Sequence, residues 1–177
     1  RRSFTEMPEL PEVQTVVDTL RPLLVGYRLA RVEHVRRDIV RPAGFGLPAA
    51  LEGRSVMSVT RRGKRVVFAL DDGKRFYVHL GMTGRLTIAS ADVPVAPHTH
   101  LIVTLASSLG IARSLRFTDA RRFGGIFWLG DADDGDETDA RLGPEPLELR
   151  AARLEAALAR TRRAIKEYLD TPIPKEW

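Results

Sequence analysis

A proline and a glutamate, Pro8-Glu9, directly follow a methionine near the start of the sequence. If Met7 is the initiator and is removed, Pro8 becomes a free secondary amine at the end of the chain. Such an amine can attack an aldehyde carbon and form an iminium, the Schiff-base chemistry that a lysine side chain otherwise supplies. An α-amino group gives up its proton more readily than a lysine does, and Glu9 is close enough in the chain to carry protons.

The same residues also have a purely structural interpretation. A proline suits the first turn of a helix, and Glu9 and Glu12 are acids that the helix dipole favours there. The catalytic interpretation has a requirement of its own, because an amide-bonded Pro8 has no nucleophilic lone pair. This matters here because residues 1–6 precede Pro8, and we expect them to be an extension or leader outside the fold.

A basic cluster, Arg61-Arg62-Gly63-Lys64-Arg65, is the second candidate for chemistry. Lys64 lies there in a positive field, which lowers the proton affinity of its amine and attracts phosphate. The alternative is a solvated lysine in a turn between two strands.

The hydrophobic pattern predicts one helix and then many short strands. Apolar residues recur at helical spacing from Glu12 to Leu24, and Gly26 ends this helix. We expect strands within residues 28–40 and at 51–60, 66–70, 76–80, 100–105 and 115–118, a loop at 43–48 and a last apolar stretch at 127–129. Short strands separated by close turns are typical of a β-sandwich or barrel.

An acidic run at residues 131–139 marks a domain boundary, because it has few apolar residues and the turn-forming chemistry of a solvated linker. A predicted amphipathic helix follows, with Leu154, Leu158, Ile165 and Leu169 on one side. One such helix cannot bury its own apolar stripe. We therefore expect an incompletely represented helical domain.

Charge and composition narrow the possible partners. The chain has 177 residues and a net charge of +5, carried mostly by arginine. Arginine suits bidentate phosphate recognition, and a basic balance of this size favours a nucleic-acid partner. No apolar run approaches the length of a membrane span, so we expect no membrane partner. The chain has no cysteine, which excludes disulfides and thiolate metal sites and fits a cytoplasmic protein.

Two histidines raise the question of a metal. His98 and His100 are two residues apart, which places them on one face of a strand. Nothing else nearby in the sequence supplies ligands, so we expect no metal site.

Five stretches of the sequence together resemble one known family. They are MPELPEV at 7–13, RRGK at 61–64, HLGMTG at 79–84, DARRFG at 119–124 and LGPEPL at 142–147. In this order they are similar to the N-terminal portion of formamidopyrimidine-DNA glycosylases, the Fpg/Nei family of base-excision repair enzymes. The resemblance covers nearly the whole chain from Met7 to about Leu169. It implies an α+β, mainly β fold, in which an N-terminal helix packs on a β-sandwich and the beginning of a helical (helix-two-turn-helix-like) domain follows.

The resemblance also implies a reaction. In the family, the mature N-terminal proline attacks C1′ of a damaged nucleotide, expels the base and forms a Schiff base. Elimination at the β and then the δ position cuts the strand on both sides of the lesion. By position, Pro8 would be the nucleophile, Glu9 the acid–base residue, Glu12 a supporting carboxylate and Lys64 a catalytic lysine that contacts the DNA.

Three further positions match the family triad that fills the gap after base extrusion: Met82, Arg121 and Phe123. Chemistry on a base requires the nucleotide to leave the stack, and an apolar wedge with a guanidinium can hold the opened duplex bent. Arg121 would face the orphaned partner base. The alternative places Met82 and Phe123 in the core, a common fate for both residue types, but their glycine neighbours favour exposed turns.

Other residues are expected to contact DNA. His79 matches a phosphate contact of the family, and Arg61 and Arg62 belong to the basic cluster. Arg122 is either a phosphate ligand or a salt-bridge partner, and the sequence does not distinguish these roles.

The resemblance divides the chain into an extension (1–6), a catalytic β-sandwich domain (7–130), an acidic linker (131–140) and a partial helical DNA-binding domain (141–177). The family's zinc finger needs four cysteines, and this chain has none, so we expect no cofactor in it. The expected partner is double-stranded DNA with a damaged base or an abasic site, bound by a monomer in the cytoplasm, at the nucleoid.

Three functions are compatible with these patterns. The first is a DNA glycosylase with AP lyase activity on oxidised purines such as 8-oxoguanine and formamidopyrimidines. The second is a catalytically silent module that binds DNA or damage, and the third is a structural or interaction domain that uses its basic face in a larger assembly. The state of Pro8 separates the first from the other two.

Overall fold

The computed structural model describes residues 8–90, 92–106 and 113–131, together with Ala151, Glu155 and Ala159. The chain divides into two compact units, Arg1–Ala132 and Asp133–Trp177. The extension at 1–6, residues 132–140 of the predicted linker and most of the predicted helix, including Leu154 and Leu158, lie outside the described residues, so these predictions remain open. Asp131, predicted as the first linker residue, instead ends a strand, and Ala151 and Glu155 are helical.

Helix α1 (Leu10–Leu24) opens the fold, and its apolar spacing explains its position. Val13, Val17, Leu20 and Leu24 face one side and are buried, as period 3.6 requires of an amphipathic helix. The predicted helix is therefore confirmed, although it begins two residues before Glu12.

In the part of the chain that the structure describes, nine strands form two sheets. The larger sheet has the order β2-β9-β5-β4-β3, with the bounds β2 Val40–Arg41, β9 Gly125–Asp131, β5 Lys74–His79, β4 Arg65–Leu70 and β3 Val56–Arg62. The smaller sheet has the order β1-β7-β8-β6, with the bounds β1 Leu29–Val35, β7 Thr99–Leu105, β8 Arg113–Thr118 and β6 Arg85–Ser90. The paired strands run antiparallel, except that β2 lies parallel to β9.

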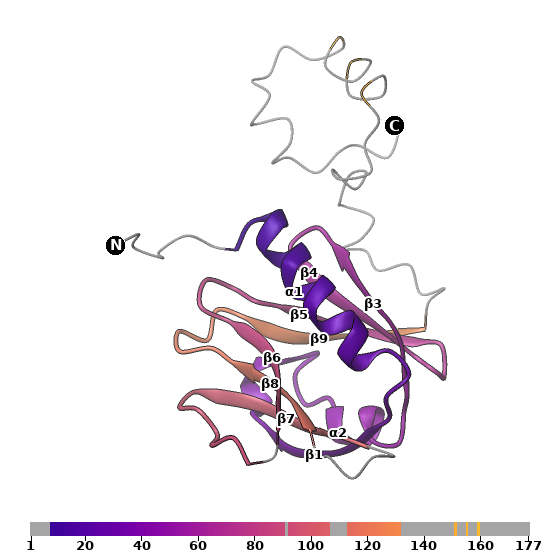
Figure 1. Cartoon of the computed structure of the whole chain (residues 1–177), viewed down its shortest axis with the longest axis vertical. Coiled ribbons are helices and arrows are strands. Elements are labelled where there is room, and N and C mark those ends of the chain that lie inside the picture. The colour runs from indigo at the N-terminus through magenta and orange to yellow at the C-terminus, as the bar shows by residue number, and fades with distance from the viewer. Residues whose placement is uncertain are drawn as a thin grey trace. The chain divides into compact units, whose positions relative to one another are not determined.

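The core lies between these layers. α1 packs on β3 and β4 of the larger sheet and also contacts β6 of the smaller sheet, and Figure 1 shows it crossing in front of the larger sheet. Phe68 and Phe76 stack at 4.7 Å between ring centroids and are fully buried, and Phe117 adds a third buried ring from β8. The predicted α+β fold, a helix packed on two β-sheets, is confirmed.

The structure differs from the sequence-based prediction in three places. Residues 85–90 form β6, a strand that the sequence did not predict. It lies at the edge of its sheet and only Leu86 is buried on it, so its apolar and polar residues alternate only weakly. The predicted loop at 43–48 gives way to a short helix, α2 (Leu47–Leu51), so β3 begins at Val56 and not at Leu51. A 3-10 turn, η1 (Arg37–Ile39), interrupts the predicted strand that ends at Val40.

Candidate active site

The tip of the β3–β4 hairpin lies against the start of α1. Arg62 pairs with Arg65 across the hairpin, which leaves Gly63 and Lys64 in the turn. Lys64 Nζ donates a hydrogen bond to Glu9 Oε1 at 2.9 Å. The side chains are 35% and 61% exposed respectively, so this ion pair is open to a ligand from solvent. The two predicted catalytic side chains, 55 positions apart in the sequence, are thus in direct contact.

The start of α1 places Pro8 outside the helix. Glu9 is the N-cap residue, and its carbonyl accepts the first helical hydrogen bond, from Val13 N at 3.1 Å. Glu12 Oε2 accepts the backbone N–H of Glu9 at 2.7 Å, one half of a capping box. The helix begins at Leu10, so the structural interpretation of Pro8 as a first-turn proline is wrong. Glu12 acts on the site by holding the backbone of Glu9.

Arg61 links the β3–β4 hairpin to α1 through its side chain. Its Nε donates to Gln14 Oε1 at 3.0 Å, and its Nη1 donates to the carbonyl oxygen of Gly63 at 2.9 Å. These bonds join α1 to the turn that carries Lys64. The DNA contacts predicted for Arg61 and Arg62 remain a prediction. The structure shows in addition that Arg61 hydrogen-bonds to both α1 and the hairpin turn. Gln14 was not foreseen, because its partner is 47 positions away.

His79 lies at the end of β5, opposite Arg65 of β4 and Gly125 of β9. Its Nδ1 accepts the backbone N–H of Gly81 at 3.2 Å, which assigns the ring proton of the neutral form to Nε2. Burial lowers the pKa of His79 below 6.5, and the positive charges of Arg65 and Lys64 lower it further. His79 is therefore a neutral donor beside the predicted catalytic lysine.

The predicted triad comes from two neighbouring loops. Met82 lies in the turn after β5, whereas Arg121 and Phe123 lie between β8 and β9. Phe123 is 56% exposed, and its ring lies 4.7 Å from the Arg121 guanidinium carbon, a cation–π contact. Phe123 is thus in an exposed turn and not in the core, while Met82 is half-buried.

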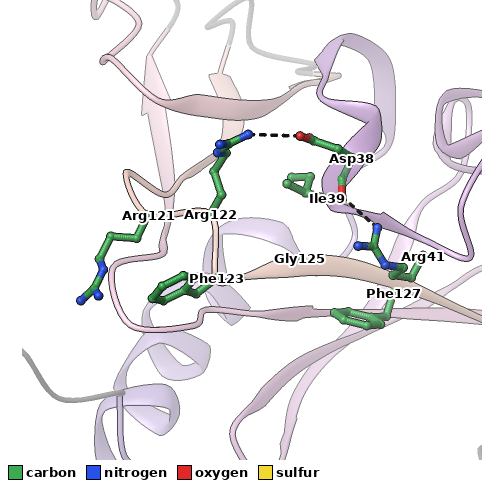
Figure 2. Close-up of a pocket in the computed structure, with 9 residues that line it drawn as sticks. Asp38, Ile39, Arg41, Arg121, Arg122, Phe123, Gly125 and Phe127 are labelled. Atoms are coloured by element: carbon green, nitrogen blue, oxygen red, sulfur yellow. Dashed lines mark hydrogen bonds and ion pairs between the residues drawn. The ribbon is translucent and has the colours of Figure 1, made fainter.

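Arg122 turns away from Arg121. Its Nη1 lies 3.3 Å from Asp38 Oδ2, and Arg36 binds the other oxygen of the same carboxylate at 2.7 Å. The hydrogen bond from Arg36 lowers the pKa of Asp38. Figure 2 shows Arg122 reaching toward Asp38, while Arg121 points to the other side of the loop. In this structure Arg122 is a salt-bridge partner.

An open pocket of about 310 Å³ lies beside this salt bridge. Phe123 and Phe127 contribute apolar surface to it, and Arg41 contributes a guanidinium. Arg41 Nη1 donates to the carbonyl oxygens of Asp38 and Val40 at 2.8 and 2.9 Å, which ties η1 to β2.

The two histidines considered for metal binding do not share a strand face. His98 has φ 62 and lies before β7, whereas His100 is buried within it. His100 Nε2 lies 2.8 Å from the carbonyl oxygen of Asp119. Asp119 itself was not singled out from the sequence, although it opens the DARRFG motif. In the described part of the chain, no group of three or more His, Cys, Asp or Glu side chains is placed to hold a metal ion.

Comparison with known proteins identifies the family. Residues 7–126 match the model of the formamidopyrimidine-DNA glycosylase N-terminal domain. The chain therefore belongs to the formamidopyrimidine-DNA glycosylase family. It is 41% identical over 167 residues to the formamidopyrimidine-DNA glycosylase of Moorella thermoacetica, an alignment that covers 92% of this chain and 60% of that protein. The corresponding enzyme of Acidiphilium cryptum is 42% identical over 166 residues, covering 92% of this chain and 58% of that protein.

Solved structures agree with this assignment. The Lactococcus lactis enzyme, non-covalently bound to DNA with an AP site, superimposes with a TM-score of 0.76 at 29% identity, covering 92% of this chain and 62% of that chain. The Thermus thermophilus enzyme gives a TM-score of 0.63 at 40% identity, covering 79% and 47%. The chain thus spans less than two thirds of the length of these relatives. Among the described helices, none is long and apolar enough to cross a membrane.

Proposed function

We propose that this chain carries the catalytic centre of a bifunctional DNA glycosylase and AP lyase that acts on oxidised purines in double-stranded DNA. The observation that carries the proposal is the 2.9 Å ion pair between Lys64 and Glu9, directly beside Pro8. Family membership supports the substrate class, because relatives are named for formamidopyrimidine-DNA, and a solved relative holds DNA with an N7-benzyl-Fapy-dG lesion.

The chemistry begins at the amine of Pro8, once it is the first residue of the chain. Its nitrogen lone pair forms a bond to C1′ as the glycosidic bond breaks, and the departing base takes the electron pair of the glycosidic bond and a proton. The new ammonium nitrogen then loses its proton, its lone pair forms the C1′=N bond of an iminium, and the C1′–O4′ bond opens with its electron pair on O4′, which accepts a proton. Glu9, at the N-cap, is the group closest in sequence to carry these protons.

The iminium then acts as an electron sink. Loss of a C2′ proton expels the 3′-phosphate by β-elimination, and a second proton loss expels the 5′-phosphate by δ-elimination. Lys64 holds the Glu9 carboxylate in place before substrate arrives, and as a cation it can also bind phosphate. The neutral His79 offers its Nε2–H to a neighbouring phosphate, and this fits its position beside Lys64.

The loops with Met82, Arg121 and Phe123 open the duplex in this proposal. An exposed aromatic ring is suited to wedge between base pairs, and a guanidinium to bind the edges of an unpaired base. In the free protein Arg121 and Phe123 are held next to each other by their cation–π contact. The net charge of +5 supports a DNA partner.

The test is base excision from a duplex with one 8-oxoguanine, followed on a gel. We expect Glu9→Gln and Pro8→Gly to abolish base release while binding to an abasic-site duplex stays nearly unchanged. Glu33→Gln is the matched control, because it removes the same charge from β1, outside the site, and should retain full activity. Wild-type release of the base in all variants would contradict the mechanism, and binding without release in the unaltered protein would favour a damage-binding module.

A further inference from the structure

Asp119 is fully buried at the base of the two loops that carry the triad. Its Oδ1 accepts hydrogen bonds from Thr83 Oγ1 and from the backbone N–H of Arg121, the latter at 3.2 Å. Its Oδ2 accepts the backbone N–H of Gly124 at 2.8 Å. One carboxylate thus binds the turn with Met82 and both ends of the loop with Arg121 and Phe123.

The backbone of Asp119 is fixed from the opposite side. Its N–H donates to the carbonyl oxygen of His98 at 3.0 Å, and its carbonyl oxygen lies 2.8 Å from His100 Nε2. These contacts anchor Asp119 to the start of β7. The carboxylate therefore projects from a rigid point of the smaller sheet into the space between the two loops.

The loops also meet directly. A Cβ added to Gly81 would lie 2.5 Å from Gly124 N and 2.6 Å from the carbonyl carbon of Phe123, so only glycine permits this approach. Thr83 Oγ1 lies 3.2 Å from Arg121 N as well as bonding Asp119. The two loops form one hydrogen-bonded unit with the carboxylate at its centre.

The charged form of Asp119 is the form that this unit requires. Burial by itself raises the pKa of this carboxyl, but the hydrogen bonds from Thr83 and from the backbone N–H groups of Gly124, Arg121 and Arg122 together lower it. Oδ2 accepts from a backbone N–H, and Oδ1 accepts from a backbone N–H and a hydroxyl, so an NH₂ group at either position loses at least one of these hydrogen bonds.

We propose that Asp119 is a positioning residue for duplex opening: it sets the spacing between Met82 on one loop and Arg121 and Phe123 on the other. The inference rests on the proposed function and assigns opening of the duplex and reaction with the nucleotide to different residues. Asp119 controls how the damaged nucleotide is reached, whereas the Pro8 amine and Glu9 react with whatever nucleotide arrives.

The amide variant separates these roles. In Asp119→Asn the NH₂ group faces either the Gly124 N–H, which then loses its acceptor, or Thr83 and Arg121, where the Thr83 hydroxyl must turn to accept from it and the Arg121 N–H keeps only its contact with Thr83 Oγ1. The loop with Met82 and the loop with Arg121 and Phe123 should then no longer be held at a fixed distance from each other. A second pair of variants is milder: Thr83→Val removes one donor with little change of shape, and Thr83→Ser keeps the hydroxyl.

The experiment compares borohydride trapping on two substrates, with the full chain processed to begin at Pro8. The first substrate is a duplex with one abasic site, and the second is a single-stranded oligonucleotide with the same site, which needs no opening. A 2-aminopurine next to the site in the duplex reports insertion of the triad by its fluorescence.

We expect Asp119→Asn to lower the trapping rate on the duplex about tenfold or more, with loss of the fluorescence change, and to leave the rate on the single strand within about twofold. Thr83→Val should follow the same pattern to a smaller degree, and Thr83→Ser should restore the wild-type ratio. A fall on both substrates in equal proportion, in Asp119→Asn and in Thr83→Val, would overturn the inference, as would unchanged rates on the duplex. Failure of the unaltered protein to form an adduct on either substrate would instead overturn the proposed function and the inference with it.

Discussion

Lys64 and Glu9 form an ion pair that contributes through where it places the Glu9 carboxylate, and not through stability. Both side chains are well exposed, and exposed ion pairs contribute about 0–1 kcal/mol to stability. The pair therefore adds little to folding. In the proposed mechanism, the pair instead holds a carboxylate next to Pro8 with its charge balanced before a substrate binds.

His79 provides a prediction at the same scale. Its folded-state pKa lies below 6.5 because of burial and the charges of Arg65 and Lys64. The unfolded chain then binds more protons than the folded chain below pH 6.5, so His79 makes the free energy of unfolding fall as the pH decreases from 6.5 through the folded-state pKa.

The measurement is an NMR titration of the His79 ring in the free protein, with urea unfolding at several pH values. We expect the ring to titrate below 6.5 and the His79→Gln variant to lose part of the pH dependence of stability in this window. A ring that titrates at or above 6.5 would contradict this account of its surroundings.

The sequence predicts which individual residues to consider where neighbours along the chain are enough to show it. Pro8 and Glu9 are adjacent, and Lys64 lies in a basic hairpin tip. Gln14 and Asp119 were not foreseeable, because their roles depend on partners from other elements. A buried carboxylate that binds backbone N–H groups cannot be recognised from a sequence pattern, because backbone donors are present at almost every position.

At the scale of elements, the two loops of the triad depend on close backbone contact. Gly81 has φ 63 and no room for a Cβ, whereas Gly73, in the turn between β4 and β5, has φ 81 and open space around it. Alanine at either position incurs the strain of a left-handed backbone, about 1–2 kcal/mol. Only Gly81→Ala should also clash with the loop of Phe123, at a further cost of about 1–3 kcal/mol.

Urea unfolding of the two variants checks this prediction. We expect the free energy of unfolding to fall more in Gly81→Ala than in Gly73→Ala, which serves as the matched control for backbone strain. Equal losses in the two variants would show that the loops do not need this contact.

Elements with strong periodicity were predictable, and weakly patterned ones were not. α1 buries one apolar face, so its spacing alone locates it. β6 is an edge strand with little burial, and α2 is a five-residue helix in a stretch rich in glycine and proline. Tertiary packing determines both, because local sequence preference is weak there.

At the scale of the whole molecule, the larger sheet organises the site. The hairpin tip of β3 and β4, the end of β5 and the start of β9 lie at the same end of the larger sheet, as the pairing of His79 with Arg65 and with Gly125 shows. The start of α1 places Glu9, and with it Pro8, at the same end of the sheet through the contact with Lys64. The resemblance assigned roles to Pro8, Glu9, Lys64 and His79 one by one, but the strand pairing that brings them together was not visible in the sequence.

The most direct test of the central claim is borohydride trapping on a duplex with one abasic or 8-oxoguanine site, followed by mass mapping of the adduct. Two forms of the chain are compared, one that begins at Pro8 and one that begins at Arg1, in which Pro8 is amide-bonded. We expect a covalent adduct on Pro8 in the first form and none on Pro8 in the second. An adduct scattered over lysines, or equal trapping of both forms, would contradict the assignment of Pro8 as the nucleophile.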